Sequence, residues 1–167
     1  MAGAMPFMRE GLTKGEHVLM VMREAGRAVL TQALDGHAAQ IEFADAEQWY
    51  RSPDHAFEGY RRYIDDHLAR GAPRVRVVAE VVWPERLEPE AVAEWKRYEA
   101  GISPAMAYIP VSFICTYDAR ELPPGIVSDA RRTHPVLRTP NGARPSPAYA
   151  EPDAFVRELQ RELQPSS

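Results

Sequence analysis

The chain has 167 residues, 45% of them hydrophobic and 26% charged, with a formal net charge of −4, which fits one folded domain and argues against global disorder. Because no basic excess would attract a phosphate backbone, we expect no direct binding to nucleic acid. No apolar run approaches the roughly 20 residues of a membrane span, the first residues lack the apolar core of a signal peptide, and the single cysteine, Cys115, fits a reducing compartment. We therefore expect a cytoplasmic protein that does not contact a membrane.

Taken in chain order, the apolar patterns predict helices that alternate with strands. Helices are expected over residues 3–12, 23–34, 53–70, 88–102, 123–132 and 152–163, and strands over 16–22, 40–43, 75–83, 111–117 and 135–137. Ser103-Pro104 should stop the fourth helix, Pro135-Val136-Leu137 should be a short closing strand, and 139–149 should be a linker because it is rich in Pro, Asn, Gly and Ser. The alternation predicts an α/β fold with a mostly parallel sheet flanked by helices, in three layers.

The strand Val75–Trp83 is the most apolar and most β-branched run in the chain, which is typical of a strand buried on both faces. It contains one carboxylate, Glu80, near its carboxyl end. Ligands bind at that end in open α/β sheets, and a buried carboxylate requires a partner. The alternative is a strand that ends at Ala79 with Glu80 already at the surface.

A second carboxylate, Glu99, lies on the apolar stripe of the helix 88–102, between Trp95 and Ile102 and beside Tyr98. If Glu80 and Glu99 point to one covered region, their like charges would raise the pKa of one of them. The alternative is that Glu99 reaches solvent or pairs with a neighbouring Lys96 or Arg97.

The strand 111–117 ends with three further candidates: Cys115, Tyr117 and Asp118. His134 precedes a proline, so its backbone should be extended, and its ring is expected near the same edge. Purely structural roles for these residues remain open. A lone cysteine is usually a core residue, an aspartate often caps a turn, and a histidine often forms a hydrogen bond with a backbone carbonyl.

Common catalytic and cofactor motifs are absent from the sequence. It contains no Gly-x-x-x-x-Gly-Lys-Ser/Thr, no Gly-x-Gly-x-x-Gly, no Gly-x-Ser-x-Gly and no His-x-x-x-His. A zinc site would need Cys115, His134 and a carboxylate without any motif spacing. We therefore expect no catalytic residues, no metal ligands and no cofactor.

The ordered segments resemble the MEDS domain, the methanogen/methylotroph sensory domain, over about residues 3–138. The segments that carry the resemblance are Pro6–Leu12, Gly15-Glu16, Glu80–Trp83, Tyr98-Glu99, Ile114–Asp118 and Thr133–Leu137. The segment Arg144–Tyr149 also resembles the one that follows this domain in anti-sigma-factor regulatory proteins, where a kinase domain often comes next. Family members usually begin with a His-bearing strand, which this chain lacks.

The resemblance implies a RecA/KaiC-like core without a phosphate loop over residues 1–138, followed by a linker and a short helix over 139–167. It also implies a non-enzymatic sensor of small molecules that regulates transcription or anti-sigma signalling through an anti-sigma or kinase-type partner, with a homodimer left open. The expected ligand-binding residues are Glu80, Trp83, Tyr98, Glu99, Cys115, Tyr117, Asp118 and His134.

Two alternatives to a sensor stay open. The first is a hydrolase or transferase with Cys115 as nucleophile, His134 as base and Glu80 or Asp118 as orienting group. The second is a protein-interaction module that binds no small molecule.

Overall fold

A computed structural model describes residues 3–34, 36–82, 88–139 and 142–163. The chain folds as two compact units: unit 1 comprises Met1–Val82 and Ile109–Thr116, and unit 2 comprises Trp83–Tyr108 and Tyr117–Ser167. Among the described residues, no helix combines the length and the apolar character that crossing a bilayer requires. The two units are described one at a time.

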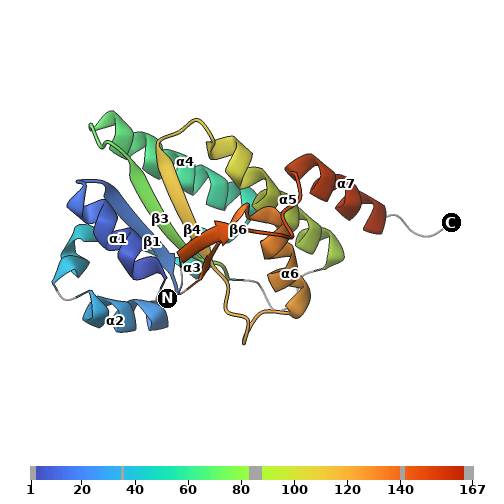
Figure 1. The fold of residues 1–167 in the computed structure, drawn as a ribbon, viewed down its shortest axis with the longest axis horizontal. Coiled ribbons are helices and arrows are strands. Elements are labelled where there is room, and N and C mark those ends of the chain that lie inside the picture. Colours follow the sequence, from blue (N-terminus) through green and yellow to red (C-terminus); the bar gives the residue numbers. More distant parts are fainter. Residues whose placement is uncertain (1–2, 35, 83–87, 140–141, 164–167) are drawn as a thin grey trace. The chain divides into compact units, whose positions relative to one another are not determined.

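Unit 1 is an α/β sandwich built on one parallel sheet of four strands (Figure 1). The strand order is β2-β1-β3-β4 and every neighbouring pair is parallel. The strands are β1 (His17–Met22), β2 (Ile41–Asp45), β3 (Val75–Glu80) and β4 (Val111–Thr116), and the helices are α1 (Ala4–Thr13), α2 (Glu24–Ala33), α3 (Ala46–Trp49) and α4 (Pro53–Ala69), with a 3-10 helix at His37–Gln40. The predicted fold class is confirmed, and the strand expected to reach Trp83 ends at Glu80.

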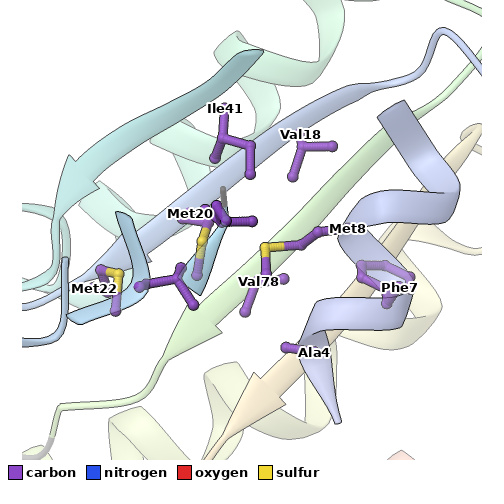
Figure 2. Packing of buried hydrophobic residues seen from close by; sticks show 10 residues of the cluster. Ala4, Phe7, Met8, Val18, Met20, Met22, Ile41 and Val78 are labelled. Carbon is purple, nitrogen blue, oxygen red and sulfur yellow. The ribbon is translucent and has the colours of Figure 1, made fainter. Parts of the chain in front are cut away.

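One face of this sheet is covered by α1 and α2. The buried cluster on this face comprises Ala4, Phe7, Met8, Val18, Met20, Met22, Leu30, Leu34, Ile41 and Val78. Figure 2 shows Met8 of α1 reaching toward Val78 in the sheet. Since successive residues of a strand point to opposite faces, Leu19, Val21 and Val77 face the other way. There Tyr60 of α4 meets Phe113 of β4 edge-on, with ring centroids 5.2 Å apart, so the two helical layers enclose β1 and β3.

An arginine is buried inside the α1 layer of unit 1. Arg76, the second residue of β3, is 6% exposed and donates to the Phe7 carbonyl at 2.7 Å and to the Glu10 carboxylate at 3.1 Å. It also forms an ion pair with Glu16. A Cβ added at Gly11 would lie 2.6 Å from the Arg76 side chain, so glycine there allows α1 to lie directly over this charge.

The described part of unit 2 contains three helices and one antiparallel pair of strands: α5 (Pro89–Met106), α6 (Pro124–Thr133), β5 (Val136–Thr139), β6 (Gly142–Pro145) and α7 (Pro152–Glu162). Two predictions were wrong here. Helix α5 continues two residues past Pro104, because a proline in the last turn costs only one hydrogen bond near the helix end. The strand after Pro135 does not close the main sheet; it pairs antiparallel with Gly142–Pro145, within the segment expected to be a linker.

Candidate functional site

In unit 2, three predicted side chains lie together around the carboxyl group of Glu99. Glu99 is buried on α5 together with Trp95 and Ile102, as the apolar stripe predicted. The Tyr117 hydroxyl donates a hydrogen bond of 2.6 Å to Glu99 Oε2. The His134 ring lies edge-on to Tyr117, with centroids 5.6 Å apart, and its Nε2 is 4.0 Å from the same Oε2 atom.

The hydrogen bonds of His134 define which ring nitrogen carries a proton. Nδ1 lies 2.8 Å from the Ala130 carbonyl oxygen, and since a carbonyl only accepts, Nδ1 is the donor in that bond. In the neutral ring Nε2 is therefore an acceptor that faces Glu99. The backbone of His134 is extended, at φ −106° and ψ 117°, as a residue before proline should be.

The pKa of Glu99 is raised by burial, and the nearby His134 ring and the Tyr117 hydroxyl lower it by smaller amounts. The main cause of this shift is desolvation and not a second carboxylate. The expected meeting of Glu99 with Glu80 stays a prediction, because Glu80 belongs to unit 1 and Glu99 to unit 2. Lys96, considered as a partner for Glu99, instead pairs with Asp129 at 2.7 Å, and Glu99 does not reach solvent because it is 8% exposed. The site thus combines a buried carboxyl group, whose pKa is raised by burial, with an acceptor nitrogen 4.0 Å from it.

A small cavity adjoins this cluster within unit 2. Its polar lining is Lys96, Glu99, Tyr117, Asp129 and Thr133, and its apolar lining is Ile126, Ala130 and Phe155. The space open to the centre of a water-sized sphere is about 10 Å³, which accommodates roughly one water molecule. Drug-sized ligands occupy several hundred Å³, so the cavity as it stands fits only a very small polar group.

Two other predicted residues of unit 2 have local roles. Asp118 accepts from the Arg120 backbone N–H and from its Nε, both at 2.9 Å, which is the turn-capping alternative. The ring of Tyr98 meets Trp95 edge-on, with centroids 5.5 Å apart. Neither residue lines the cavity.

The other three predicted residues, Glu80, Cys115 and Trp83, are not among the described residues of unit 2. Glu80, at the end of β3 in unit 1, accepts from the Arg23 backbone N–H at 2.9 Å and from its Nε at 2.8 Å, so the partner that burial requires is Arg23 at the start of α2. Cys115 is half-buried on β4 of unit 1, whereas His134 belongs to unit 2, so their pairing stays a prediction. Trp83 lies outside the described residues.

Sequence reasoning missed the ion pair of Lys96 and Asp129 and the place of Phe155. Asp129 is one of several charged residues on an amphipathic helix, and no local pattern marks it. Phe155 lies on the last helix and is 3% exposed. Its part in the cavity depends on tertiary packing of α7 with α5 and α6.

Comparison with protein families identifies the family of the chain. The model described as "MEDS: MEthanogen/methylotroph, DcmR Sensory domain" matches residues 1–135. No curated protein and no solved structure matches the chain. The matched region includes Glu99, Tyr117 and His134, and it ends before α7.

Proposed function

The chain belongs to the MEDS family of sensory domains, and from this premise we propose that it binds a small molecule at the cavity beside Glu99 and signals to a regulatory protein without catalysing a reaction. The observation that carries the proposal is the convergence of Glu99, Tyr117 and His134 in a buried position next to a cavity. A buried, protonatable carboxyl group is costly to keep, and small-molecule sites typically combine apolar walls with a few such polar groups.

The chemistry of the lining favours a particular kind of ligand. Ile126, Ala130 and Phe155 offer apolar contact, and the Glu99 carboxyl group offers one hydrogen bond. A small, largely apolar compound with a single hydroxyl, carbonyl or amine group matches this surface. Because the cavity has room for only about one water molecule, binding of anything larger would have to displace side chains that line it.

Phe155 links the cavity to the C-terminal helix, which suggests how occupancy would be transmitted. Phe155 is on α7, and Arg132 of α6 both stacks over its ring at 4.9 Å and forms an ion pair with Glu158 of α7. A ligand that displaces Phe155 would loosen α7 from α5 and α6. We place the output at α7, with a cytoplasmic partner of the anti-sigma or kinase type that regulates transcription.

Native mass spectrometry of the purified protein tests for binding, since a co-purified small molecule would appear as a mass adduct that denaturation removes. The identified compound is then titrated by calorimetry into the wild type, Glu99→Gln and Glu94→Gln. Glu94 is exposed on the same helix, so it is the matched control. We expect at least a tenfold loss of affinity for Glu99→Gln and none for Glu94→Gln.

Hydrogen exchange of α7 with and without the compound tests the output. Faster exchange of the α7 amides in the complex would support the proposal. Equal affinity of the wild type and Glu99→Gln would contradict the assignment of the cavity, and unchanged exchange of α7 would contradict the route of the signal.

A further inference from the structure

A second cluster of side chains that could ligate a metal ion lies in unit 1, outside the site proposed above. His17 is the first residue of β1, Glu42 is in β2 and His67 is near the end of α4. One ligand atom from each of them lies within 4.8 Å of the other two. His67 Nε2 is 3.2 Å and His17 Nδ1 is 3.9 Å from the same Glu42 oxygen, Oε1.

The sheet register explains why these three residues meet. Glu42 is paired with Leu19 in the parallel ladder, and His17 is two residues before Leu19, so both side chains point to the face that α4 covers. On α4, Tyr60, Ile64 and His67 form its buried stripe. The cluster therefore sits at the amino end of β1, between the sheet and the last turns of α4.

The His67 ring is the most buried of the three side chains. Its side chain is 9% exposed, and its pKa is lowered, first by burial and then by His17. Arg70, just after α4, also lowers this pKa. Asp66 of α4 and Glu42 of β2 raise it. A neutral imidazole and an ionised carboxylate are the ligand forms that bind divalent metals.

The cluster also has unsatisfied polar atoms. Among the described residues, His67 Nδ1 is buried with no hydrogen-bond partner, and the buried Tyr63 hydroxyl lies beside Glu42 without a hydrogen bond of ordinary geometry. The pKa of Tyr63 is raised, first by burial and then by the Glu42 carboxylate. Burying such groups is unfavourable, so the contacts among the described residues leave this cluster incompletely satisfied.

We propose that His17, Glu42 and His67 form a binding site for a divalent transition-metal ion of the zinc type. Ligand atoms around tetrahedral zinc lie roughly 3.3 Å apart, given bonds of about 2.0–2.2 Å. The His67–Glu42 separation of 3.2 Å already fits. The His17 side chain is 45% exposed, so rotation of this ring closes the remaining gap and solvent reaches the site.

Two imidazoles and one carboxylate favour zinc, cobalt, nickel or iron(II) over magnesium and calcium, which prefer oxygen ligands. Three protein ligands leave one tetrahedral position for water or for an exogenous group. The site ties β1, β2 and α4 together, so occupancy would stabilise unit 1. It does not depend on the cavity beside Glu99.

The experiment uses the full chain without an affinity tag, treated with EDTA and dialysed, and titrates it with Zn²⁺ by calorimetry. The variants are His17→Ala and Glu42→Gln, both at exposed positions, and the matched control is His55→Ala, an exposed histidine on α4. We expect one Zn²⁺ per chain, at least a tenfold weaker affinity for each of the two variants, and wild-type affinity for His55→Ala. Mg²⁺ at the same concentration should not compete.

Thermal melts give an independent readout, because a ligand that binds only the folded state raises Tm. Zn²⁺ should raise the Tm of the wild type and of His55→Ala, and it should not raise that of His17→Ala or Glu42→Gln. Circular dichroism of the metal-free variants establishes that they are folded. Absence of 1:1 binding, or wild-type affinity in both His17→Ala and Glu42→Gln, would overturn the proposal.

Discussion

The Tyr117 hydroxyl donates a hydrogen bond of 2.6 Å to the buried carboxyl group of Glu99. Tyr117 follows the last sheet strand and Glu99 is in the middle of α5, 18 residues earlier. This bond satisfies one oxygen of a side chain that is 8% exposed. It therefore fixes the orientation of a buried carboxyl group in the lining of the cavity.

Replacing Tyr117 by Phe removes this donor and leaves the Glu99 oxygen buried without it. The free energy of unfolding should fall by about 1–3 kcal/mol, the typical cost of an unsatisfied buried polar group. Because Tyr117 lowers the pKa of Glu99, the variant should raise it further. Urea denaturation measures the loss, and Tyr108→Phe is the control because Tyr108 is fully exposed; equal losses in both variants would contradict the role given to the hydroxyl.

Glu99 should make stability depend on pH in a defined direction. Its pKa in the folded state is above the ordinary 4.5, so the folded chain binds more protons than the unfolded chain between these two values. The contribution of Glu99 is fully present below pH 4.5 and declines as pH rises toward its folded pKa. Glu99→Gln cannot ionise, so the difference in unfolding free energy between wild type and variant should change across this window and be constant on either side of it.

Glu80 and Arg23 should be coupled energetically within unit 1. Their contacts span 2.6–2.9 Å, and the side chains are 20% and 35% exposed, respectively, so solvent screening limits the gain. A double-mutant cycle with Glu80→Gln and Arg23→Met should give a coupling energy of about 1 kcal/mol. Glu24→Gln, at an exposed position of the same helix, should show almost none; a coupling of zero for Glu80 would mean that it does not anchor α2.

Glu16 should be the essential partner of the buried Arg76. Glu16→Gln preserves size but removes the negative charge beside a guanidinium that is 7% exposed, so we expect a loss of about 3 kcal/mol. Glu10 contacts the same arginine but is 52% exposed, so Glu10→Gln should cost much less. Denaturation of the two variants under the same conditions checks the ranking, and the reverse order would show that exposure does not determine the strength of these pairs.

The sequence by itself determined the α/β class, because the Val-rich runs Val75–Glu80 and His17–Met22 predict strands buried on both faces and the segments between them have helical periodicity. It also placed Glu99 on the buried stripe of α5, since residues three and four apart share a helix face. Gly36, three residues after the end of α2, has a φ of 85°, which glycine adopts readily. Each of these patterns lies within a single helix or strand, so the sequence alone is enough to predict the element.

Only the tertiary structure decided which side chains meet. The strand order β2-β1-β3-β4 brings Glu42 beside His17 of β1. The packing of α4 against the sheet then brings His67 close to these two residues. The spacing of residues 17, 42 and 67 in the sequence does not indicate that they meet. Likewise, Arg23 proved to be the partner of Glu80 and Asp129 that of Lys96. Contacts between residues far apart in the sequence depend on strand order and helix packing. These are determined by the whole chain, so no single segment carries a sequence pattern that predicts them.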